Sequence, residues 1–134
     1  MQEKIIFVFP GQGAQYVGMG ADLCRDFASA RYVFEQVSDI AKRDMTKICF
    51  NGSQNELNKP ENTSLATFAH SVAIANIIES EYGVPLHTLA YAMAGHSMGQ
   101  YSALHCVGSM KMDDAVHMLA ARATYMQNVA GAGG

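Results

Sequence analysis

The pentapeptide GHSMG at residues 95–99 follows an apolar run at 89–94 and precedes a helix-like stretch at 100–104. A strand, a G-x-S-x-G turn and a helix in this order are typical of a nucleophile elbow, where a strand delivers a serine to a sharp turn. The flanking glycines let backbone segments pass without Cβ clashes. Unpaired N–H groups at the start of the following helix suit an oxyanion. The pattern favours acyl transfer through a covalent ester of Ser97, and a serine that only caps a helix is the alternative.

A second glycine-rich segment, FPGQGAQ, occupies residues 9–15. It begins at the last residue of a mostly apolar run at 4–9. Its glycines permit close backbone approach, and its N–H groups are able to point at an oxyanion. It lacks the G-x-G-x-x-G spacing of a dinucleotide site and the G-K-[ST] ending of a phosphate-binding loop. A tight turn without a ligand is the alternative interpretation.

Two strands, each followed by a glycine-rich turn and a helix, predict an α/β fold with a parallel sheet and flanking helices. We expect strands at 4–9 and 89–94 and helices at 21–42, 63–82, 100–107 and 112–129. Because the carboxyl ends of parallel strands meet at one edge, the two glycine-rich loops should share a crevice.

Helix signals and apolar periodicity add detail to this prediction. Asn62 or Thr63 is the expected N-cap of the second long helix, and Gly83 is its expected stop. Apolar spacing predicts which faces are buried. The residues on these faces are Phe27, Ala30, Phe34, Val37 and Ala41, then Leu65, Phe68, Val72 and Ala75, then Ala115, Val116, Leu119, Ala123 and Met126.

Length and charge exclude several functional classes. The 134 residues suit one domain, and a net charge of −3 without a Lys/Arg block argues against nucleic acid and anionic membranes as partners. No apolar run reaches the roughly 18 residues of a membrane span, and the N-terminus has no signal-peptide pattern, so we expect a cytoplasmic protein. Cys24, Cys49 and Cys106 form no metal motif and are expected to be free thiols in a reducing compartment.

Four stretches carry a resemblance to a known family: residues 7–15 (FVFPGQGAQ), 56–58 (ELN), 94–104 (AGHSMGQYSAL), and Arg122 with 126–127 (MQ). In order and spacing they resemble the malonyl-CoA:acyl carrier protein transacylases and the related acyltransferase domains of fatty-acid and polyketide synthases. The resemblance spans the whole chain and implies an α/β-hydrolase-like large subdomain. It also implies that Ser97 takes malonyl from coenzyme A and passes it to the phosphopantetheine thiol of acyl carrier protein. The resemblance implies no metal and no redox cofactor. Coenzyme A enters as part of the thioester substrate.

The resemblance assigns roles to further residues. The backbone N–H groups of Gln12 and Met98 would form the oxyanion hole, and Arg122 would bind the free carboxylate of malonate. A planar guanidinium pairs with a carboxylate through two parallel hydrogen bonds, which fits that role. His96, next to the nucleophile, is a further candidate for substrate binding.

The sequence departs from the family pattern in three places. Gln100 replaces a usual glutamate, and Ser64-Leu65 replaces a common Gln-Pro pair. The general-base histidine of the family lies beyond the last residue of this chain. The other histidines are predicted to have structural or surface roles: His70, His87, His105 and His117.

The absence of the family's general-base histidine from residues 1–134 predicts which part of the fold this chain represents. Residues 1–134 are expected to be the N-terminal part of the large subdomain, truncated before a ferredoxin-like small subdomain. Residues 130–134 resemble the start of the linker to it. A complementary chain that carries the missing histidine would complete the enzyme.

Two other interpretations stay open. A truncated acyltransferase would dock coenzyme A or carrier protein without turnover, and the missing histidine favours this, because serine without a base is a weak nucleophile. An α/β-hydrolase-type esterase or thioesterase would use the same elbow. The sequence has no H-G-G-G loop, however, and Arg122 serves no purpose with a neutral ester.

Overall fold

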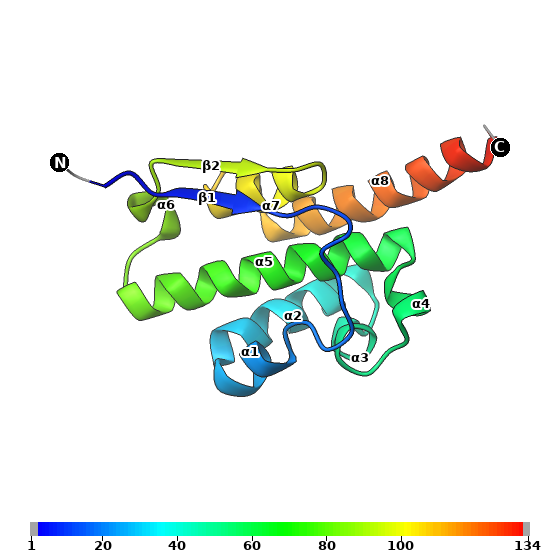
Figure 1. The fold of residues 1–134 in the computed structure, drawn as a ribbon, viewed down its shortest axis with the longest axis horizontal. Helices are drawn as coiled ribbons and strands as arrows, with labels where there is room; N and C mark the ends of the chain where they lie inside the picture. Colours follow the sequence, from blue (N-terminus) through cyan, green and yellow to red (C-terminus); the bar gives the residue numbers. More distant parts are fainter. Residues whose placement is uncertain (1–2, 133–134) are drawn as a thin grey trace.

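The computed structural model describes residues 3–132 and has a two-stranded parallel sheet packed against helices (Figure 1). Strand β1, Ile6–Phe9, pairs with β2, Ala92–Gly95, in a register that sets Phe9 beside Gly95. The predicted α/β class with a parallel sheet is confirmed. Because the carboxyl ends of both strands lie side by side, the loops that follow them lie at the same edge of the sheet.

The predicted helix at 21–42 is two helices, α1 at Ala21–Asp26 and α2 at Ala28–Ala41. They are separated by Phe27, whose backbone is extended at φ −129° and ψ 119° and whose side chain packs against the core. Arg31 Nη1 donates to the carbonyl O of Cys24 at 2.7 Å and so satisfies an acceptor at the end of α1. The single-helix prediction was wrong because apolar spacing alone does not mark a one-residue break.

Two short helices, α3 at Met45–Phe50 and α4 at Gln54–Leu57, lie where no element was predicted. Each begins at a side-chain cap, because Asp44 Oδ1 accepts from the Lys47 N–H at 3.0 Å and Ser53 Oγ from the Glu56 N–H at 3.1 Å. Such capping residues favour turns as much as helices, and these helices are too short for an apolar period to appear.

The long helix α5, Pro60–Tyr82, runs between the sheet and the pair α1 and α2 (Figure 1). It begins with Pro60 in its first turn and Lys59 as N-cap, so the predicted caps Asn62 and Thr63 were wrong. Proline suits a first turn, where the missing N–H would have no helical partner. The predicted stop is confirmed, because Gly83 ends α5 in the left-handed region at φ 69°.

The second half of the chain has helices α6 at Leu86–Leu89, α7 at Gly99–Cys106 and α8 at Met112–Ala132. The strand predicted at 89–94 begins later than predicted, at Ala92, because Leu89 belongs to α6. Helix α8 extends beyond its predicted end at 129. Residues 130–132 of the predicted linker start are thus helical, and residues 133–134 lie outside the described residues. Within residues 3–132, none of the helices combines the length and the apolar composition that a membrane span requires.

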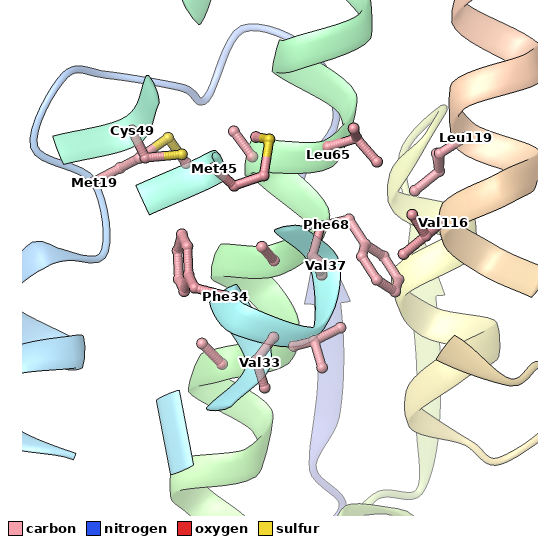
Figure 2. Close-up of a cluster of buried hydrophobic side chains, with 14 of the residues drawn as sticks. Met19, Val33, Phe34, Val37, Met45, Cys49, Leu65, Phe68, Val116 and Leu119 are labelled. Carbon is pink, nitrogen blue, oxygen red and sulfur yellow. The ribbon is translucent and has the colours of Figure 1, made fainter. Parts of the chain in front are cut away.

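The main core lies between α2, α5 and α8 (Figure 2). Phe34 from α2, Phe68 from α5 and Leu119 from α8 are fully buried in it. The predicted buried faces of α5 and α8 are confirmed at Leu65, Phe68, Val72, Ala75, Ala115, Val116, Leu119 and Ala123. Met126 was predicted to be buried but is 47% exposed, since α8 continues past the core contacts.

All three cysteines are free thiols, as predicted; Cys24 and Cys49 are buried and Cys106 is half-buried. Burial raises the pKa of Cys49 and of Cys106 to about 12. Both thiols are therefore protonated and poorly nucleophilic at neutral pH, which argues against a catalytic role.

Gly83 and Gly131 give a matched test of backbone strain, because an added Cβ would meet nothing at either position. Gly83 has φ 69°, whereas Gly131 lies within α8. We expect Gly83→Ala to lower the free energy of unfolding by about 1 kcal/mol, the cost of a left-handed alanine. Gly131→Ala should not lower it, since alanine favours a helix. Urea unfolding of both variants would check this, and equal losses would contradict it.

Candidate active site

The turn between β2 and α7 is held by contacts that require its glycines. A Cβ atom on Gly95 would collide with the backbone of Gly99, so strand and helix meet with no space for a side chain. Ser97 lies between them at φ 52°, in the left-handed region, which costs a non-glycine residue about 1–3 kcal/mol. Close backbone packing therefore holds the serine in a strained turn.

The loop after β1 packs directly on this turn. A Cβ atom on Gly11 would lie 2.6 Å from the carbonyl O of His96 and 3.4 Å from Cβ of Ser97. The N–H of His96 donates to the carbonyl O of Phe9 at 3.1 Å. The two glycine-rich loops thus adjoin one another at the serine, and Pro10 and His96 line one shallow cavity, in agreement with the predicted shared crevice.

Two backbone N–H groups next to the serine, those of Gln12 and Met98, form no hydrogen bond within residues 3–132. Met98 follows the serine directly as the N-cap of α7, and its side chain is fully buried, which fixes its backbone. Gln12 follows Gly11, which is itself buried. Free N–H groups on fixed backbone are the kind of donor that stabilises an oxyanion.

Arg122 reaches this turn from α8. Its Nη2 donates to Ser97 Oγ at 3.1 Å, although the two residues are far apart in sequence. Arg25 illustrates the usual surface arrangement, with an ion pair to Asp26 at 2.9 Å. Arg122 makes no such pair with any carboxylate within residues 3–132. An uncompensated guanidinium therefore lies beside the serine hydroxyl.

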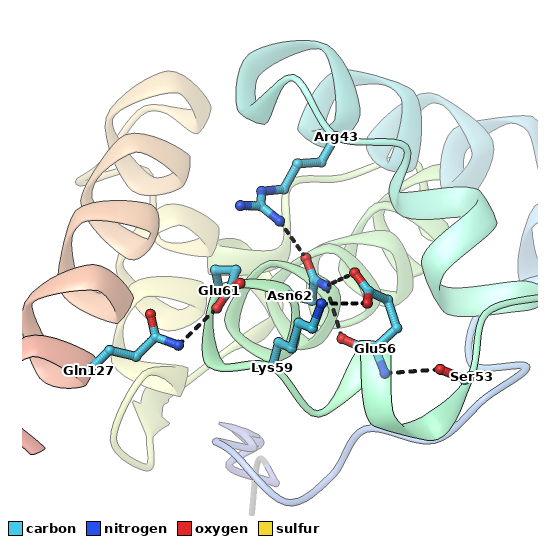
Figure 3. Close-up of polar contacts among 7 residues, drawn as sticks. All are labelled: Arg43, Ser53, Glu56, Lys59, Glu61, Asn62 and Gln127. Atoms are coloured by element: carbon cyan, nitrogen blue, oxygen red, sulfur yellow. Dashed lines mark hydrogen bonds and ion pairs between the residues drawn. The ribbon is translucent and has the colours of Figure 1, made fainter. Parts of the chain in front are cut away.

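Helix α8 is held against α5 in a way that fixes the position of Arg122. Ala115 and Leu119 are fully buried on the face toward the core. Near the other end of α8, Gln127 Nε2 donates to Glu61 Oε2 on α5 at 3.2 Å (Figure 3). Contacts on both sides of Arg122 along the helix thus tie α8 to the rest of the chain.

No histidine within residues 3–132 hydrogen-bonds Ser97. His96 is exposed at the crevice. His105 Nδ1 lies 2.9 Å from the carbonyl O of Met110, which accounts for it as a structural residue. His70 packs edge-on to the Tyr16 ring, and burial lowers its pKa. The exposed histidines outside the crevice are His87 and His117, in line with predicted surface roles.

Residues 6–134 match the acyl transferase domain family. A malonyl CoA-acyl carrier protein transacylase of Bacillus subtilis is 40% identical over 125 residues, which are 93% of this chain and 30% of that protein. An acyl-carrier-protein-S-malonyltransferase from Bartonella henselae matches with a TM-score of 0.89 and 36% identity, over 93% of this chain and 40% of its own.

A third match is a structure of a type II PKS acyl-carrier protein in complex with its malonyl-transacylase. It has a TM-score of 0.86 and 37% identity, over 94% of this chain and 40% of that one. This chain thus spans 30–40% of the length of the three proteins that it matches. The family match over almost every residue, together with these folds, shows that the chain belongs to the acyl transferase domain family.

Proposed function

We propose that this chain supplies the nucleophile, the oxyanion hole and the carboxylate site of an S-malonyltransferase. In the proposed reaction Ser97 Oγ attacks the thioester carbonyl carbon of malonyl-CoA. The carbon–sulfur bond breaks, and coenzyme A leaves as the thiol with the proton of the serine. The phosphopantetheine thiol of acyl carrier protein then attacks the malonyl ester and releases Ser97. Coenzyme A enters as the thioester substrate, and the proposal needs no metal or redox cofactor.

The contact between Arg122 and Ser97 is the observation that carries this proposal. In a malonyl group a single methylene separates the carboxylate from the acyl carbon. A malonyl ester on Ser97 therefore keeps its carboxylate near the guanidinium of Arg122. A guanidinium binds a carboxylate through two parallel hydrogen bonds, and none within residues 3–132 already occupies this one. A neutral ester substrate would leave the positive charge without a partner, which disfavours the esterase interpretation.

We assign the turn at residues 95–99 as a nucleophile elbow with the N–H groups of Gln12 and Met98 as its oxyanion hole. The left-handed Ser97, the contact between Gly95 and Gly99, and the two unpaired N–H groups support the assignment. Such donors act on the charge that develops in the transition state, so they accelerate the chemical step. His96 is exposed beside the serine and is proposed to contact the bound acyl or coenzyme A group.

We propose that residues 1–134 form the N-terminal part of the large subdomain and that the general base lies in the remainder. Two observations support this: no histidine within the described residues 3–132 hydrogen-bonds Ser97, and the relatives are two to three times as long, by the coverages above. In addition, Ile6 and Val8 of β1 are 57% and 75% exposed, although parallel sheets are usually covered on both faces. The proposed location is the cytoplasm.

Labelling with radioactive malonyl-CoA tests the proposal. We expect the label on Ser97 in the whole gene product, identified by peptide mass spectrometry, and none in Ser97→Ala. Arg25→Ala is a matched control, because Arg25 is exposed and pairs with Asp26 away from the serine. Binding of malonyl-CoA without a covalent label would instead support the alternative, a docking module that lacks turnover.

A further inference from the structure

A chain of side-chain amides fastens the loop after β1 to helix α4. The N–H of Gly13 donates to Gln15 Oε1 at 2.8 Å, so the loop closes on itself next to Gln12. Gln15 Nε2 donates in turn to Asn58 Oδ1 at 3.0 Å, across a long stretch of sequence. The conformation of the loop therefore depends on an acceptor that lies outside it.

Asn58 Oδ1 accepts from a second amide as well. Gln54 Nε2 donates to it at 2.8 Å, while Gln54 Oε1 accepts from the N–H of Val17 at 3.4 Å. Two donors thus converge on one oxygen, and between them they hold the loop at Gly13 and at Val17. The side-chain Nδ2 of Asn58 makes no hydrogen bond within residues 3–132, so the side chain of Asn58 acts only as an acceptor.

Helix α4 is a firm support for this acceptor, although Asn58 itself is exposed. Leu57 is fully buried, and its carbonyl O accepts from Thr63 Oγ1 of α5 at 2.7 Å. The carbonyl O of Glu56 accepts from Asn62 Nδ2 at 2.9 Å, and Arg43 Nη1 donates to Asn62 Oδ1 at 3.0 Å (Figure 3). Asn62 and Thr63, which were wrongly predicted to cap α5, therefore hold α4 against α5.

We propose that Asn58 is a positioning residue for the oxyanion hole. The amide chain from Asn58 through Gln15 fixes the peptide that follows Gln12, and Gly11 before it is packed on Ser97. Together these contacts set the direction of the Gln12 N–H relative to the serine. The inference rests on the proposed function, because it gives Asn58 an effect only if an oxyanion forms beside Ser97.

The test compares three variants of the whole gene product. Asn58→Leu keeps the size of the side chain and removes the acceptor, and Asn58→Asp keeps the acceptor. Asn55→Leu changes an exposed residue of the adjoining helix α4. The readout is the rate of Ser97 acylation by malonyl-CoA in a rapid-quench experiment. Removal of an oxyanion donor costs about 10²–10³-fold in rate, so misplacement by Asn58→Leu should cost about tenfold.

We expect the slowing by Asn58→Leu to appear in the maximal rate, with the half-saturating malonyl-CoA concentration unchanged. Asn58→Asp should stay within about twofold of wild type, because its carboxylate accepts from both amides. Asn55→Leu should leave the rate unchanged. These hydrogen bonds are exposed and contribute little to stability, so the variants should fold, and their melting curves would verify this.

Gln15→Met breaks the same link from the loop side and guards against a folding defect that is particular to Asn58→Leu. The double variant should be no slower than either single variant, since both changes remove one contact chain. Equal rates for wild type and Asn58→Leu would overturn the inference alone, and so would an Asn58→Asp variant as slow as Asn58→Leu. Absence of any label on wild-type Ser97 would overturn the proposed function and this inference together.

Discussion

Residues 1–134 alone are expected to transfer malonyl from malonyl-CoA to acyl carrier protein about 10²–10⁴-fold more slowly than a complete transacylase. This range is the usual contribution of general acid–base catalysis. The reason lies in the partners of Ser97 Oγ: within residues 3–132 its hydrogen bond comes from Arg122, which donates and is always protonated. A guanidinium stabilises charge, but it does not remove the proton of the attacking serine. Steady-state transfer of radioactive malonyl would measure the deficit.

A polypeptide that carries the remainder of a relative should restore the rate if the two parts associate. Ser97→Ala in residues 1–134 is the control for this experiment, because restored transfer with that variant would mean that the added polypeptide is active by itself. Full activity of residues 1–134 without any addition would contradict the prediction. One of the five histidines would then be the base, and substituting each by glutamine would identify it.

The parts of the fold that follow from local rules could be predicted from the sequence. The two glycines that flank residues 96–98 indicated a turn without space for side chains, and Gly95 and Gly99 are in close contact. The buried face of α5 followed from apolar spacing because Leu65, Phe68 and Val72 all face the core. Each of these features is encoded by residues a few positions apart.

The features that depend on distant partners could not be predicted in this way. Asparagine is a common helix cap, but Asn62 lies inside the first turn of α5. Its side-chain amide donates to the carbonyl O of Glu56 in α4. The role of Asn58 requires Gln15, which lies on another loop. The contact of Arg122 with Ser97 depends on how α8 is rotated, and sequence spacing does not determine this. Only the family resemblance indicated that arginine.

Replacement of Arg122 is expected to change acyl selectivity. In the whole gene product, Arg122→Ala should lose malonyl transfer by about one to two decades more than acetyl transfer. A charge-assisted hydrogen-bonded contact contributes about 1.5–3 kcal/mol, and about 1.4 kcal/mol changes a rate tenfold. The comparison with acetyl matters because Arg122 also donates to Ser97 Oγ. Any loss through that contact affects both acyl groups equally, so the difference reports the carboxylate alone.

Arg122→Lys separates charge from geometry in the same assay. Lysine keeps the positive charge but lacks the planar fork that binds a carboxylate through two hydrogen bonds, so its selectivity should fall between wild type and Arg122→Ala. Arg25→Ala should leave both rates unchanged, because Arg25 pairs with Asp26 on the surface. Equal losses of malonyl and acetyl transfer in Arg122→Ala would remove Arg122 from carboxylate recognition. Its contact with Ser97 would then be a means of holding the serine, and malonyl selectivity would have to come from other residues.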